Sequence, residues 1–134
     1  MKYMLDTNIC IYLIKQQPPQ VLRHFQAARV GDIGVSSITV AELQYGVHKS
    51  QHPAQNSAAL AQFLLPLSIA DFNAAAALAY GNLRATLERS GMPIGALDML
   101  IAAHALSLNV TLITNNLREF SRVPGLNVVD WTTD

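Results

Sequence analysis

Three acidic residues stand where predicted helices begin, and carboxylates gathered in this way could hold a divalent metal ion. Asp6 ends the apolar run at residues 3–5, and Glu42 and Asp98 occur at two later helix starts. Each also has a purely structural explanation, because an acid in a first helical turn gains about 0.3–1 kcal/mol from the helix dipole and can cap the helix. The structural explanation is most specific for Glu42, because Thr39 three residues earlier would form a capping box with it.

Two features favour metal chemistry over capping. Asp98 shares a predicted helix stripe with Ile101 and Ala105, so it faces the apolar side, where an unpaired charge is costly. Helix starts that follow parallel strands lie along one edge of a sheet, where the three carboxylates would converge. At ~5 Å and an effective dielectric of ~20, each pair would repel by roughly 3 kcal/mol, more than capping supplies. A hard cation such as Mg²⁺, bound by oxygen ligands, offsets that repulsion.

Short strand-like runs alternate with helical segments along the chain. Strands are predicted at residues 3–5, 33–36, 67–69, 110–113 and 127–129. Helices are predicted at residues 9–15, 19–28, 37–46, 54–65, 71–89, 94–108 and 117–120. This alternation predicts an α/β fold with a mainly parallel sheet covered by helices on both faces. No repeat or linker interrupts the pattern, so residues 1–134 are expected to form a single domain.

Composition narrows the classes of function. Of 134 residues, 51% are hydrophobic and 13% are charged, with nine basic and nine acidic side chains. The balanced charge gives no global attraction to nucleic acid or membrane, so an anionic partner must be held by a local basic patch or by a metal. Cys10 is the single cysteine and cannot form an internal disulfide. No apolar run approaches the ~20 residues of a spanning helix, and a cytoplasmic protein without membrane contact is expected.

Several motifs in a fixed order carry a resemblance to a known family. They are residues 4–8 (MLDTN), 36–43 (SSITVAEL) with Gly46, 93–98 (PIGALD), 101–105 (IAAHA) and 112–116 (LITNN) followed by 118–120 (REF). Over nearly its whole length the chain resembles PIN-domain ribonucleases, and more closely VapC toxins of bacterial toxin–antitoxin pairs. The resemblance implies five parallel strands, a VapB-like antitoxin partner, a homodimer and endonucleolytic cleavage of structured RNA, often tRNA. Cleavage of initiator tRNA in its anticodon stem-loop is carried over as a hypothesis.

The resemblance also implies a metal site. It makes Asp6, Glu42 and Asp98 the catalytic ligands of Mg²⁺ or Mn²⁺. The family often has a fourth acid after the fourth strand, where this chain has Asn116, so one tightly held ion is expected. Glu119 could replace the missing carboxylate, but a surface charge is the preferred interpretation.

Other polar residues receive supporting roles. Side chains that could orient the ligands, or else form local turns, are Thr7, Asn8, Thr114 and Asn116. Candidate phosphate contacts, each of which could instead be a solvated surface charge, are Lys49, Arg84, Arg89, Arg118 and Arg122. Because Arg118 and Arg122 are four residues apart, they could share a helix face and act together. Residues expected to pack inside the protein are Cys10, Tyr45, Tyr80 and His104.

Two competing interpretations remain open. A metal-dependent phosphohydrolase with an aspartyl nucleophile would need a second aspartate two residues after the first, and Asn8 occupies that place. A non-catalytic PIN-like module that binds RNA or protein would be marked by loss of the acids, and all three are present. A nucleotide-binding Rossmann function is disfavoured because no Gly-x-Gly-x-x-Gly pattern follows any predicted strand.

Overall fold

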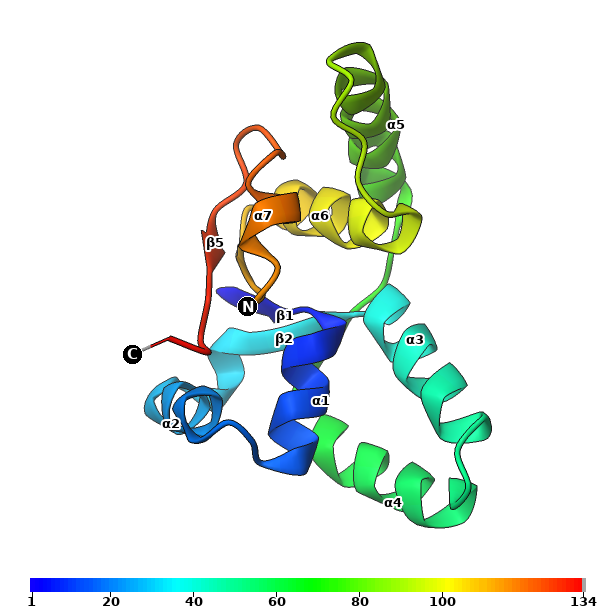
Figure 1. Cartoon of the computed structure of the whole chain (residues 1–134), viewed down its shortest axis with the longest axis vertical. Coiled ribbons are helices and arrows are strands. Elements are labelled where there is room, and N and C mark those ends of the chain that lie inside the picture. The colour runs from blue at the N-terminus through cyan, green and yellow to red at the C-terminus, as the bar shows by residue number, and fades with distance from the viewer. Residues whose placement is uncertain (134) are drawn as a thin grey trace.

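A five-stranded sheet with every strand pair parallel forms the centre of the protein (Figure 1). The computed structural model describes residues 1–133. The strands are β1 (Tyr3–Leu5), β2 (Ile33–Ser36), β3 (Ser68–Ala70), β4 (Thr111–Ile113) and β5 (Val128–Val129). Their order across the sheet is β3-β2-β1-β4-β5, so β1 is central and Met4 aligns with Gly34 on one side and Leu112 on the other. The predicted α/β fold with a parallel five-stranded sheet is confirmed.

Helices cover both faces of this sheet. They are α1 (Thr7–Lys15), α2 (Pro19–Ala27), α3 (Ser37–His48), α4 (Pro53–Leu64), α5 (Ala74–Arg89), α6 (Ala96–Leu108) and α7 (Leu117–Phe120), with a 3₁₀ turn at Val30–Asp32. Figure 1 shows α5, α6 and α7 on one side of the sheet and α1 to α4 on the other. No helix within residues 1–133 has the length and apolar character needed to cross a membrane.

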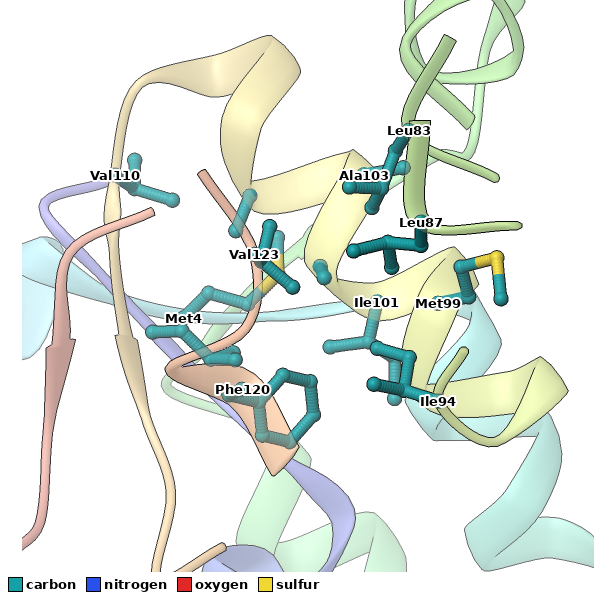
Figure 2. Close-up of a cluster of buried hydrophobic side chains, with 13 residues drawn as sticks. Met4, Leu83, Leu87, Ile94, Met99, Ile101, Ala103, Val110, Phe120 and Val123 are labelled. Atoms are coloured by element: carbon teal, nitrogen blue, oxygen red, sulfur yellow. The ribbon is translucent and has the colours of Figure 1, made fainter. Parts of the chain in front are cut away.

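Each face of the sheet has its own hydrophobic core. Successive side chains of a strand point to opposite faces, so Met4 and Leu5 of β1 enter different cores. Met4 packs in the core that includes Ile101 and Phe120, between the sheet and α5, α6 and α7 (Figure 2). Leu5 belongs to the core that includes Ile9 of α1. The two cores fix α1, α3 and α6, which carry the predicted site residues, relative to the central strand.

Two predicted helix caps differ from the structure. Helix α3 follows β2 without a loop, so Ser36 takes the cap position and its Oγ accepts a hydrogen bond from the Ile38 backbone N–H at 3.0 Å. Thr39 is therefore buried inside the helix, and the predicted capping box is wrong. Asp71, at the start of the helix predicted over residues 71–89, is not the cap of α5 either, because the chain stays non-helical after β3 until Asn73, whose side chain caps the helix.

Candidate active site

Asp6 lies at the carboxyl end of the central strand and is 5% exposed. Its Oδ1 accepts a hydrogen bond from the Ile9 backbone N–H at 2.9 Å, so it does cap α1. Burial raises the pKa of Asp6, hydrogen bonds from Thr114 and Ile9 oppose this, and the charges of Glu42 and Asp130 raise it further. Capping thus accounts for one oxygen of Asp6, while the carboxylate as a whole lies in a negatively charged environment.

Glu42 is the sixth residue of α3 and lies beyond its first turn. Its Oε1 accepts a hydrogen bond from Thr7 Oγ1 at 2.7 Å, although the two residues are 35 positions apart in the sequence. Because Ser36 caps α3, the structural explanation that the sequence offered for Glu42 no longer applies. The predicted supporting residue Thr7 instead holds this carboxylate beside the end of β1.

Asp98 lies in the first turn of α6 and is half-buried. Burial, followed by the charges of Glu119, Asp6 and Glu42, raises the pKa of Asp98 to about 6. The charges of the three predicted carboxylates therefore act on one another at one edge of the sheet. Within residues 1–133 they are not close enough as placed to hold one ion, so convergence on a metal stays a prediction.

Glu119 on α7 is a fourth acid beside Asp6, Glu42 and Asp98. Its carboxylate is hydrogen-bonded to Asp98 and accepts hydrogen bonds from the Gly95 backbone N–H and, at 2.9 Å, from Asn116 Nδ2. The Gly95 N–H is the main cause of the lowered pKa of Glu119. When Asp98 is protonated, below its pKa of about 6, it donates to Glu119, whose lowered pKa keeps that carboxylate charged. Glu119 is thus a partly exposed charge that is also hydrogen-bonded to this group, and one of its hydrogen bonds comes from Asn116.

Asp130 is a further acid that the sequence analysis missed. It follows β5, and its charge raises the pKa of Asp6. Its Oδ1 also accepts hydrogen bonds from the backbone N–H and Oγ1 of Thr132, at 2.8 and 2.6 Å. The sequence could have identified Asp130, because it directly follows an apolar strand, which is the same pattern that identified Asp6.

The donor set suits a hard divalent cation, although the carboxylates are not arranged around one point. Within residues 1–133, no three acidic, histidine or cysteine side chains are close enough as placed to ligate one ion. Asp6, Glu42 and Asp98 are each turned toward a different hydrogen-bond partner. Among residues 1–133, none of these three carboxylates forms a salt bridge with a lysine or arginine. The salt bridge of this part of the chain joins Arg84 and Glu88 on α5. Rotation of these side chains would direct oxygen ligands and uncompensated negative charge toward a shared cation.

The predicted phosphate contacts occupy different places. Arg84 is exposed on α5, where its Nε lies 3.3 Å from Glu88 Oε2 and its Nη1 donates to the Tyr80 hydroxyl at 3.0 Å. Lys49 is the C-cap of α3, the helix that carries Glu42, and its Nζ lies 4.9 Å from the centre of the Tyr45 ring. Tyr45 is 67% exposed, so the expectation that it packs inside the protein is wrong.

The expected pairing of Arg118 and Arg122 on one helix face is also wrong. Helix α7 ends at Phe120, so Arg122 lies outside it and donates instead to the Pro93 backbone carbonyl at 3.1 Å. Arg118 is exposed on α7 beside Glu119, and Arg89 is exposed at the end of α5. Asn8, expected to support the ligands, is exposed in the first turn of α1.

Comparisons with known proteins agree with this architecture. A family model described as "PIN domain" matches residues 3–126. The chain is 48% identical over 132 residues to Ribonuclease VapC2 of Rickettsia felis, with 98% of each chain covered. It is 46% identical over 132 residues to the tRNA(fMet)-specific endonuclease VapC of Shigella flexneri, covering 98% of this chain and 99% of the relative. DNA-bound VapBC from Salmonella typhimurium contains a similar chain with a TM-score of 0.93 and 43% identity, covering 98% of both.

Proposed function

The chain belongs to the PIN-domain family, as a VapC-type ribonuclease toxin of a toxin–antitoxin system, and from that premise we propose how its carboxylates cleave RNA. PIN nucleases are typically metal-dependent, and we assign Mg²⁺, with Mn²⁺ as a substitute, to the group formed by Asp6, Glu42, Asp98 and Glu119. The observation that carries this proposal is the pKa of Asp98, which the neighbouring carboxylates help to raise to about 6 in the absence of a basic partner within residues 1–133. A divalent cation would relieve that repulsion.

Each carboxylate has a distinct part in this mechanism. A cation held by these carboxylates would supply Lewis-acid activation of the scissile phosphate and of the attacking water. Asp6 would be the central ligand, because it follows the central strand and its charge is coupled to both Glu42 and Asp98. Asp98 is the second ligand. Glu42, oriented by Thr7, binds through water or accepts the proton of the nucleophile, and the products carry a 5′ phosphate and a 3′ hydroxyl.

Glu119 supplies a fourth negative charge, the role of substitute carboxylate that was the less favoured interpretation from the sequence. Its two oxygens are held by Gly95 and Asn116, so its carboxylate is preorganised beside Asp98. One tightly held ion was expected because Asn116 stands where the family often has a fourth acid. With Glu119 beside Asp98, the group has four carboxylates, so it is also compatible with a second, more weakly bound ion.

The substrate we propose is structured RNA, specifically initiator tRNA cut in its anticodon stem-loop. The support is that relatives from Shigella flexneri and Salmonella typhimurium, 46% and 43% identical, are named tRNA(fMet)-specific endonucleases. Lys49 and Arg118 are the phosphate contacts we favour, because α3 and α7 also carry Glu42 and Glu119. Arg84 is not among the contacts we favour, because α5 carries none of the four carboxylates.

The partner is a VapB-like antitoxin, as in the solved VapBC assemblies that contain similar chains. We propose that one antitoxin segment lies in the apolar groove of about 320 Å³ between α1, α3 and α4. The groove is lined by Ile11, Leu43 and Leu60 and also by Thr7 and Glu42, so its occupant would reach the carboxylates. We also expect a homodimer, which the apolar groove between α5 and α6 around the 78% exposed Leu78 would favour.

The decisive experiment compares the wild-type protein, freed of antitoxin, with Asp6→Asn on total RNA and on initiator tRNA in Mg²⁺. Asparagine can also cap a helix, so the variant should keep its fold but lose cleavage. Glu88→Gln is the matched control, because it removes an exposed acid far along α5, and it should cleave like the wild type. Equal cleavage by wild type and Asp6→Asn would refute the metal site. RNA binding without any cleavage by the wild type would favour a non-catalytic module.

A further inference from the structure

His104 is buried in the middle of α6 and is 1% exposed, away from the carboxylates. Its Nδ1 lies 2.8 Å from Ser36 Oγ. The Phe72 ring meets the imidazole edge-on, with ring centres 5.3 Å apart. The ring also lies against the backbone carbonyl of Asp71, and Asp71 is the charged residue that acts on it within the described part of the chain. One side chain of α6 therefore contacts both the end of β2 and the segment after β3.

The hydrogen bonds determine which ring nitrogen carries the proton. Because Nδ1 faces Ser36, we assign the hydrogen bond with the Asp71 carbonyl to Nε2, and since a carbonyl can only accept, Nε2 is then protonated. Nδ1 is then an acceptor in the neutral ring, and the Ser36 hydroxyl donates to it. Ser36 Oγ still accepts from the Ile38 N–H at 3.0 Å, which is the cap of α3. The same hydroxyl thus joins the start of α3 to α6.

A second contact strengthens this junction. The Phe72 backbone N–H donates to Ser37 Oγ at 3.0 Å, which ties the segment after β3 to the first residue of α3. The first turn of α3 is therefore held from two sides, by His104 of α6 and by Phe72. Helix α3 carries Glu42 and α6 carries Asp98, so the junction links the two helices whose carboxylates must face each other.

We propose that His104 is a positioning residue for the RNA-cleavage reaction, whose neutral ring holds Ser36 and thereby sets the place of Glu42 relative to Asp98. This role rests on the proposed function of those two carboxylates. Glu42 follows Ser36 by six residues, a distance of about 9 Å along a helix. A tilt of about 5° at Ser36 would move Glu42 by roughly 0.8 Å on that lever. A misplacement of about 1 Å can lower an enzymatic rate by about 100-fold, so a loosened junction is expected to be measurable.

Two substitutions separate the contacts of the ring. In His104→Asn the side-chain oxygen takes the approximate place of Nδ1 and can still accept from Ser36. His104→Gln reaches toward Asp71 instead and leaves the Ser36 hydroxyl without its acceptor. With an initiator tRNA transcript and saturating Mg²⁺, we expect kcat of His104→Gln to fall about tenfold with KM unchanged, and kcat of His104→Asn to stay within about threefold of wild type.

Leu87→Ala is the control for a general loss of stability. Leu87 is buried on α5 in the core shared with α6 and has no contact with the junction through a hydrogen bond. Its truncation should lower Tm at least as much as His104→Gln while leaving kcat near the wild-type value. A kcat loss in Leu87→Ala equal to that in His104→Gln would overturn the positioning role, as would equal losses in the Asn and Gln variants.

A spectroscopic measurement tests the junction without relying on activity. In ¹⁵N-histidine-labelled protein, His104 Nδ1 should resonate as an unprotonated nitrogen and Nε2 as a protonated one. The Ile38 and Glu42 amide signals should shift, and the Ile38 amide should exchange faster with solvent, in His104→Gln but not in His104→Asn. A protonated Nδ1, or unchanged amides in His104→Gln, would refute the proposal. If the wild type fails to cut RNA while these spectra behave as expected, the proposed function fails and the junction stands.

Discussion

Asp98→Asn removes the carboxylate whose pKa the site raises to about 6, and it should stabilise the metal-free protein at neutral pH. The folded-state pKa lies above the unfolded value of 3.8, so the folded state binds the additional proton between these two values. Stability that depends on this proton is fully present below about pH 4 and is lost as the pH rises through about 6. Ionised Asp98 therefore destabilises the folded protein at pH 7 and above, and asparagine avoids that cost.

The magnitude follows from the shift and from the exposure of Asp98. A rise of about two pKa units corresponds to about 3 kcal/mol as an upper limit. Because Asp98 is only half-buried, solvent screening reduces this to about 1–2 kcal/mol. For a domain of this size, that free energy corresponds to an increase in Tm of about 4–8 °C.

The assay is thermal unfolding of both proteins in a chelator from pH 4 to pH 8. The Tm difference should be largest at pH 7–8 and vanish near pH 4. Saturating Mg²⁺ should reverse the order, because the wild type binds the ion more tightly and gains RT ln(1 + [L]/Kd). Glu88→Gln, which alters an exposed acid of α5, should show no such pH-dependent gain. A Tm loss of several degrees for metal-free Asp98→Asn at pH 7.5 would refute the reasoning and show that Asp98 serves α6 through its dipole.

Three other substitutions test separate parts of the structure. Glu119→Gln should weaken Mn²⁺ binding about 10- to 100-fold by calorimetry, and unchanged affinity would return Glu119 to a surface role. Thr7→Val loses the hydrogen bond from Thr7 Oγ1 to Glu42 and should lower kcat about tenfold with little change in Tm. An unchanged kcat would contradict the proposal that Thr7 orients Glu42. Gly34→Ala should destabilise the protein by about 1–3 kcal/mol in denaturant unfolding, because its Cβ would lie 2.7 Å from the Ser68 carbonyl oxygen. Gly81→Ala on α5 meets nothing within 4 Å and is the control, which should be neutral or stabilising.

Local patterns were enough to predict the framework and to place Asp6 and Asp98 at the start of α1 and in the first turn of α6. Apolar runs marked all five strands, and prolines and glycines marked the helix limits within a few residues. Asp6 was predictable because an acid follows a buried strand in a parallel sheet. Asp98 was predictable because it shares a helix stripe with residues that proved to be buried, such as Ile101.

The missed features depend on tertiary structure. Thr39 and Asp71 match cap patterns locally, but β2 runs directly into α3 and the chain after β3 remains extended, so Ser36 and Asn73 take those positions. Glu119 looks like a charge on a short helix until α7 is placed beside the start of α6. That placement follows from the pairing of β4 with β1, which no local pattern specifies.

The strand order also has a consequence for how the protein is made. Tyr3 of β1 pairs with Thr111 of β4, so the helices α1 to α6 are all translated between these two neighbouring strands. Thr114 and Glu119, which contact Asp6 and Asp98, are added only after β4 has been translated. A nascent chain therefore carries three of its acids without the elements that hold them in place. A chain of this topology therefore cannot hold its carboxylates in place until β4 and α7 have been translated, and we expect chains that terminate before β4 to lack nuclease activity.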